Sequence, residues 1–109
     1  MKTQLRAVIV VVALLGAACS KEGEPGSCYR PHDNACIDYD RAQGAAGKRL
    51  CSGLRWTAGE KSCPTVDRVG SCAKKTGAEW FYGGPPNNYN ASSAKTACEW
   101  AGGVFTPLP

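Results

Sequence analysis

The sequence contains few of the residues on which catalysis, membrane crossing and nucleic-acid binding usually depend. His32 is the only histidine, and no spacing pairs it with a nucleophile and an orienting acid. The longest apolar run, residues 7–15, is too short to span a bilayer, which takes about 20 apolar residues. The net charge is only +4, and without Lys2 and Arg6 eleven basic residues face nine acidic ones. We therefore expect no nucleic-acid partner.

Metal sites and paired carboxylates are equally scarce. Cys28, His32 and Cys36 suggest zinc ligands, but structural zinc takes four ligands with closer cysteine pairs, and an oxidising compartment favours disulfides. Asp38 and Asp40 are expected on different faces of a helix, so they form no glycosidase-like pair. The sequence thus predicts no enzyme, no cofactor and no metal. A small hydrolase would instead require a cleft containing paired carboxylates with perturbed pKa values.

An export segment stands at the N-terminus. Lys2 and Arg6 form a charged start, the apolar run 7–15 follows, and small residues end the segment, so residues 1–18 are predicted to be a signal peptide. The stretch Leu14-Leu15-Gly16-Ala17-Ala18-Cys19-Ser20 resembles the lipobox of bacterial lipoproteins, in which signal peptidase II cleaves before a diacylated cysteine. Gly16 departs from that family's pattern, which usually has leucine three positions before the cysteine. The resemblance implies a lipid anchor at Cys19, which makes the membrane a partner.

An ordinary secretory signal cut after Ala18 is the alternative. It leaves seven cysteines in an oxidising compartment and therefore one unpaired thiol, whereas acylation of Cys19 accounts for the odd cysteine. By resemblance to lipoproteins of Gram-negative bacteria, Ser20 after the cysteine implies transfer to the outer membrane. The expected location is therefore the cell envelope, or the medium if the lipobox is not used.

The mature chain is expected to begin with a tether and to continue as one small domain. Residues 19–27 contain the lipidated cysteine and a polar stretch with glycine and proline but no apolar residue to bury, which is typical of a flexible tether. The remaining residues 28–109 are predicted to fold as a cysteine-rich domain. A core of this size usually needs covalent support.

Disulfide bonds between the six cysteines of the domain are predicted to provide that support. An even number of cysteines in an exported chain indicates three bridges, and fifteen pairings are possible. The six are Cys28, Cys36, Cys51, Cys63, Cys72 and Cys98.

An internal repeat offers a basis for choosing among these pairings. Gly26-Ser27-Cys28 recurs as Gly70-Ser71-Cys72, and in each half an alanine-bearing segment then ends in a cysteine followed by glycine and an aromatic, strand-like piece. Residues 26–63 and 70–109 therefore align as degenerate repeats. The alignment predicts equivalent pairs Cys28–Cys51 and Cys72–Cys98, and it leaves Cys36 and Cys63, which have no counterparts, to pair with each other. The alternative is a coincidental match of a short glycine-rich motif.

The predicted fold class is α+β, with two short helices against short antiparallel strands. Residues 69–74 and 79–82 indicate a hairpin around the turn 75–78. Ala94, Ala97, Cys98 and Ala101 mark one face of a helix that Asn90 or Ser92 caps.

The first half contains the weaker helix. We expect it over residues 38–51, with Asp38 as the cap and Leu50 toward the interior, followed by a strand-like piece at 54–57. A further strand-like piece lies at 104–106. The aromatic core candidates are Trp56, Phe81, Trp100 and Phe105.

The candidate binding residues are Trp80, Tyr82, Asn87, Asn88 and Tyr89. The first two alternate with Phe81 and are candidates for a solvent-facing surface, unless they simply fill the core. The loop 83–90 is either a rigid recognition loop or a plain connector. We expect a lipid-anchored envelope protein that binds an envelope protein or glycan or has a structural role. The alternative is a secreted inhibitor or toxin-like effector that uses the 83–90 loop.

Overall fold

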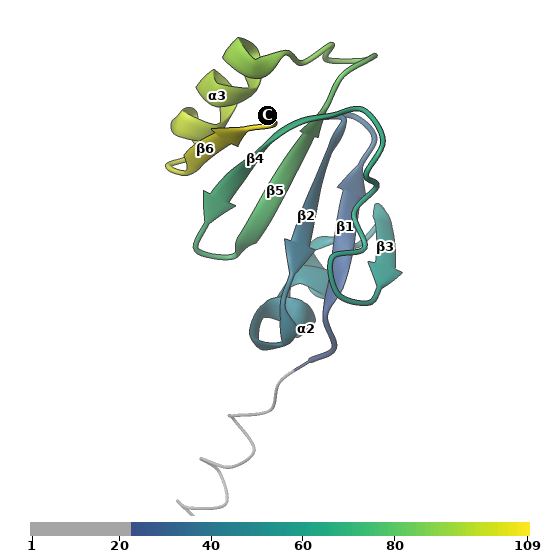
Figure 1. Ribbon diagram of the computed structural model, residues 1–109. Helices are drawn as coiled ribbons and strands as arrows, with labels where there is room; N and C mark the ends of the chain where they lie inside the picture. Colours follow the sequence, from purple (N-terminus) through teal and green to yellow (C-terminus); the bar gives the residue numbers. More distant parts are fainter. Residues whose placement is uncertain (1–22) are drawn as a thin grey trace, which may run out of the picture.

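The computed structural model describes residues 23–109, so the predicted signal peptide and Cys19 lie outside the described residues. Within this range the elements follow in the order β1 (Gly26–Arg30), β2 (Ala35–Tyr39), α2 (Arg41–Leu50), β3 (Arg55–Ala58), β4 (Arg68–Lys74), β5 (Gly77–Tyr82), α3 (Ala91–Trp100) and β6 (Val104–Pro107). The strands form one antiparallel sheet in the order β3-β1-β2-β5-β4-β6 (Figure 1). The fold is α+β, and it contains more sheet than the predicted short strands. Among residues 23–109, no helix has the length and apolar character needed to cross a membrane.

Both helices cover the same face of the sheet. Cys28, Ile37, Glu79 and Cys72 lie opposite one another across the four central strands, so their side chains share one face. Disulfides join Cys28 to the C-terminal end of α2 and Cys72 to α3. The other face of the sheet therefore carries no helix among the described residues.

The two halves of the domain have the same topology. Each half runs strand, strand, helix, strand, and its first strand pairs with both of the others. The cysteine of each Gly-Ser-Cys motif marks the equivalent positions: Cys28 opposes Ile37 and Trp56, and Cys72 opposes Glu79 and Phe105. The halves meet where Ile37 of β2 faces Glu79 of β5, so an approximate twofold axis passes through this pair.

The glycine of the repeated motif has a packing role in both halves. A Cβ at Gly26 would lie 2.2 Å from the ring of Trp56, and a Cβ at Gly70 would lie 2.4 Å from the ring of Phe105. The aromatic ring of the neighbouring strand therefore crosses the glycine directly. The Trp56 ring also packs against the ring of Tyr39, with ring centres 6.1 Å apart.

The three disulfides join Cys28 to Cys51, Cys36 to Cys63 and Cys72 to Cys98. These are the pairs that the alignment of the two halves predicts. The first and third occupy corresponding places, because each links the first strand of a half to its helix. Three disulfides in a small domain point to an oxidising, extracytoplasmic environment.

The first helix begins later than predicted. Asp38 and Tyr39 belong to β2, and the N-cap is Asp40, whose side chain accepts a hydrogen bond from the backbone nitrogen of Gln43. The interior face of α2 consists of glycine, since a Cβ at Gly47 would lie 2.5 Å from the Tyr39 ring. Leu50, expected inside, is 71% exposed, because it lies about 100° around the helix from the buried Cys51 and so points away from the sheet.

The second helix is found where the apolar periodicity predicts it, capped by Asn90. Ala94 and Cys98 are fully buried in it. Trp100 is wrong as a core candidate: it is 88% exposed, because two residues after Cys98 the helix has turned it away from the sheet.

Two boundaries and two strands also differ from the expectation. The folded domain begins before the expected start at residue 28, because Pro25, Gly26 and Ser27 are buried and Gly23 packs on α2. Gly77 starts β5 instead of belonging to the turn. The strands β1 and β2 themselves were not predicted, because neither segment shows a sustained alternation of apolar and polar residues.

A candidate binding cleft under residues 59–67

Residues 59–67, which we call the connector, join β3 to β4 across the face of the sheet that the helices leave free. Cys36 alternates along β2 with Ile37, which faces the helices, so Cys36 points to the opposite face. Its disulfide to Cys63 fixes the middle of the connector there. Figure 1 shows this segment running past β1 and β2 on its way to β4.

Asp38 is the polar centre of this attachment. Its Oδ1 accepts hydrogen bonds from the Ser27 hydroxyl and, at 3.1 Å, from the backbone nitrogen of Cys63. Its Oδ2 accepts a hydrogen bond from Nε1 of Trp80 at 3.0 Å. One carboxylate thus connects the connector to three strands of the sheet.

Arg68 and Tyr82 hold the second half of the connector. The guanidinium carbon of Arg68 lies 3.7 Å from the ring centre of Trp80, and the same group donates to the carbonyl oxygens of Cys63 and Pro64. The Tyr82 hydroxyl also donates to the carbonyl oxygen of Pro64, at 2.7 Å. Burial raises the pKa of Tyr82 to about 12, so this donor stays protonated at neutral pH.

Between the connector and the sheet lies a cavity of about 480 Å³, which we call the connector cleft. Its lining combines aromatic, apolar and polar side chains, among them Tyr29, Arg55, Thr57, Pro64, Val66 and Asp67. This volume falls in the range of small-molecule sites, and the lining is more polar than is usual for them.

Part of the polar lining is already paired. The Ser62 hydroxyl lies 2.7 Å from that of Ser27, and the Tyr29 hydroxyl donates to Oδ1 of Asn34 at 2.7 Å. Arg55 and Asp67 differ, because within residues 23–109 neither side chain forms an ion pair. The guanidinium carbon of Arg55 lies 5.7 Å from the ring centre of Tyr29. Arg55 is therefore the cationic group of the lining that can meet an acidic ligand, and Asp67 is an acidic group in the same lining.

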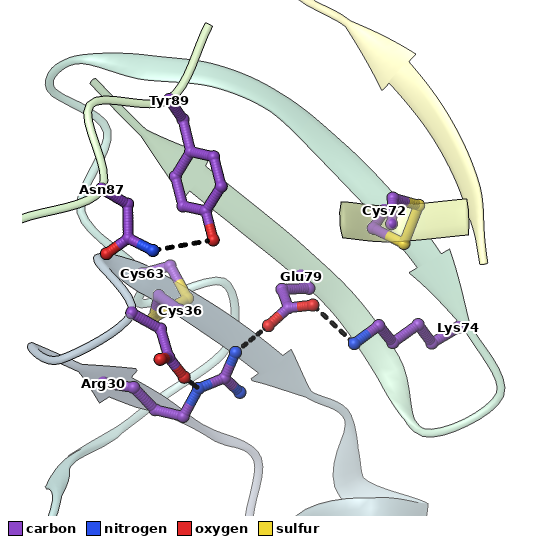
Figure 2. A network of polar contacts seen from close by, with 10 residues as sticks. Arg30, Cys36, Cys63, Cys72, Lys74, Glu79, Asn87 and Tyr89 are labelled. Atoms are coloured by element: carbon purple, nitrogen blue, oxygen red, sulfur yellow. Dashed lines mark hydrogen bonds and ion pairs between the residues drawn. A yellow bond between two sulfur atoms is a disulfide. The ribbon is translucent and has the colours of Figure 1, made fainter. Parts of the chain in front are cut away.

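A second polar cluster lies on the helix-covered face (Figure 2). Glu79 is only 2% exposed, and its carboxylate forms ion pairs with both Arg30 and Lys74. Burial acts to lower the pKa of Arg30, but attraction to Glu79 and the contact with Asp33 outweigh it, so that this pKa lies above its ordinary value. Every charge in this cluster has a partner, and we interpret the cluster as a structural link between the halves.

The predicted binding residues do not form one surface. Trp80 and Tyr82 lie on the connector side, where Tyr82 lines the cleft and Trp80 is covered by Arg68. Asn87 and Asn88 are exposed in the loop after β5. Tyr89 packs edge-on against Phe81 with ring centres 5.0 Å apart, on the helix side, and Asn87 donates to its hydroxyl at 3.3 Å (Figure 2).

Several residues that line the cleft are not among those that the sequence predicts. Tyr29 lies in the unpredicted strand β1, and Asp67 lies in the connector, which has no sequence signal of its own. For Arg55 a signal exists, because it alternates with the predicted core residue Trp56 and so points away from the helices. His32 is exposed in the turn after β1, and in the described part of the chain no three His, Cys, Asp or Glu side chains gather as a metal site.

Comparison with known proteins gives no relative for this fold: no family model, no curated protein and no solved structure matches the chain.

Proposed function

We propose that this protein is a lipid-anchored, extracytoplasmic binding protein of a bacterial cell envelope, without enzymatic activity, and that the connector cleft is its ligand site. The observation that carries the proposal is the cleft itself, a cavity of about 480 Å³ beneath a segment fixed by a disulfide. The lipobox-like stretch ending at Cys19 supports the anchor, and the disulfides fit an oxidising compartment.

The lining favours a ligand that combines a carboxylate with a flat or apolar surface. Arg55 offers a planar guanidinium that binds carboxylates with two parallel hydrogen bonds. Tyr29, Pro64 and Val66 offer surface against which a sugar ring or an apolar side chain packs. Acidic glycans and acidic peptides of the envelope share this chemistry.

Titration of the oxidised mature protein with uronic-acid oligosaccharides and with acidic peptides, followed by two-dimensional NMR, tests the proposal. We expect shifts confined to the cleft and a loss of affinity of about tenfold or more in Arg55→Ala, as for a charged hydrogen bond. Lys95→Ala is the matched control, because Lys95 is an exposed cation on α3, far from the cleft lining. Equal affinities in the two variants, or shifts centred on the 83–90 loop, would contradict this site.

The proposal includes an origin of the two halves by duplication. Their common topology and corresponding disulfides favour duplication of one strand-strand-helix-strand unit. The bridge Cys36–Cys63 distinguishes the halves, because Ala78 occupies the position of Cys36 in the second half. The cleft thus depends on a bridge that the shared scaffold does not require.

A further inference from the structure

We propose that helix α2, together with the turn between β4 and β5, docks on anionic lipid headgroups of the bilayer that carries the anchor. This inference rests on the proposed lipid anchor at Cys19. It adds a second contact with the membrane, made by the folded domain itself, and a defined orientation of that domain.

The first argument is the short distance between anchor and domain. Only three residues separate Cys19 from Gly23, and four extended residue steps reach at most about 14 Å. Gly23 already packs on α2, where a Cβ on it would lie 2.5 Å from the backbone nitrogen of Ala45. The helix is therefore the element that an anchor at Cys19 holds nearest to the bilayer.

The second argument is the charge of this helix. Arg41 and Lys48 lie one turn on either side of Gly44 and Ala45, so they flank the place where the chain reaches the domain. Arg49 adds a third exposed cation, and α2 contains no acidic residue. Within residues 23–109, none of the three cations forms an ion pair.

Lys75 extends this surface. It is exposed in the turn between β4 and β5, which lies at the same end of the molecule as α2 (Figure 1). Two acidic residues adjoin the helix, Asp40, which caps it, and Glu24, whose carbonyl oxygen lies against Gly44, so the surface retains an excess of positive charge. Each cation near an anionic membrane surface adds to its attraction.

The equivalent helix of the second half provides an internal comparison. Helix α3 occupies the corresponding place over the sheet but carries one cation, Lys95, and one acid, Glu99, with no basic residue in its last turn. The two helices share length and packing and differ in charge. The cations are thus concentrated on the helix next to the anchor. The structural role that both helices share does not require them, because α3 has that role with a single cation.

The test uses the lipidated, full-length mature protein in two kinds of vesicle, pure phosphatidylcholine and phosphatidylcholine with about one third phosphatidylglycerol. Lysine acetylation rates are read by mass spectrometry. We expect Lys48 and Lys75 to react at least about threefold more slowly on the anionic vesicles, with Lys95 unchanged, and this protection to vanish near 1 M salt, where the Debye length is about 3 Å. The docking would be overturned if Lys48, like Lys95, reacted at the same rate on the anionic vesicles as on the neutral ones.

A variant and a control separate docking from anchoring. Arg41→Gln combined with Arg49→Gln removes two exposed cations, so we expect it to lose the protection of Lys48, whereas Lys95→Gln keeps it. Flotation of the same samples reports the anchor directly. Protein that floats with both kinds of vesicle but shows no protection overturns the docking alone, and protein that does not float with phosphatidylcholine vesicles overturns the lipid anchor and the docking with it.

Discussion

Ile37 and Glu79 face each other where the two halves of the sheet meet, and each occupies the same position within its own half. In the first half this position is apolar. In the second it is a carboxylate that Arg30 and Lys74 neutralise, and these two cations are themselves equivalent, since each lies two residues after the cysteine of its motif. The halves therefore share a scaffold but join through an asymmetric contact that depends on one buried charge.

Glu79→Gln tests the importance of this charge. The substitution keeps the shape of the side chain but leaves two half-buried cations without their partner, so we expect a loss of about 2 to 4 kcal/mol in the free energy of unfolding. Denaturant unfolding without reductant measures it. Asp33→Asn is the matched control, because it removes an exposed partner of Arg30 and should cost less than about 1 kcal/mol. Similar losses in both variants would contradict this interpretation.

Asp38→Asn tests the attachment of the connector. The amide nitrogen that replaces one carboxylate oxygen donates and cannot accept, so one oxygen is left for the three donors of Ser27, Cys63 and Trp80, and we expect a loss of about 1 to 3 kcal/mol. Hydrogen exchange of the Cys63 amide should also become faster. The control Asp67→Asn changes a carboxylate at the end of the connector whose backbone φ of +62° an asparagine tolerates. The attachment would be refuted if Asp67→Asn increased the hydrogen-exchange rate of the Cys63 amide as much as Asp38→Asn does.

Removing the bridge from Cys36 to Cys63 should open the cleft and leave the two halves folded. In the double variant Cys36→Ala, Cys63→Ala we expect a loss of about 2 to 4 kcal/mol and fast hydrogen exchange confined to residues 59–67. The control double variant Cys72→Ala, Cys98→Ala should release α3 instead, because its bridge holds that helix. Fast exchange spread evenly over the domain in both variants would speak against independent roles for the bridges.

Tyr82 makes stability fall at high pH. Burial raises its pKa to about 12 in the folded state from the ordinary value of 10, so the folded protein holds the phenolic proton more tightly than the unfolded chain. Its contribution is complete below pH 10 and is lost as the pH rises from 10 to 12. Tyr82→Phe should be less stable at neutral pH, because it loses the bond to Pro64, but should show a shallower decline over this window. An unchanged slope would refute the assignment to Tyr82.

The parts of the fold that were predictable have strong local signals. Asn90 as a cap and the spacing of Ala94 and Cys98 predict α3, and the repeated Gly-Ser-Cys motif predicts the disulfide pairs. The reason for the motif was visible only in three dimensions, where the aromatic rings of the edge strands lie across Gly26 and Gly70.

The parts that were missed depend on contacts distant in sequence. Asp38 looks like a helix cap from its neighbours, yet it bonds to Cys63 and Trp80, far along the chain. Trp100 looks like a core residue from its type alone, but the helix turns it to solvent. The cleft was not predictable, because its walls come from the sheet and from a connector whose path is fixed by Cys36–Cys63.

The intact mass of the protein from its native host, measured without reduction in the membrane and medium fractions separately, tests the central claim most directly. We expect a membrane-bound species that begins at Cys19, carries added acyl mass and lacks the six hydrogens of three disulfides. An unacylated species in the medium that begins at the same residue would contradict the lipid anchor and favour a secreted inhibitor or effector.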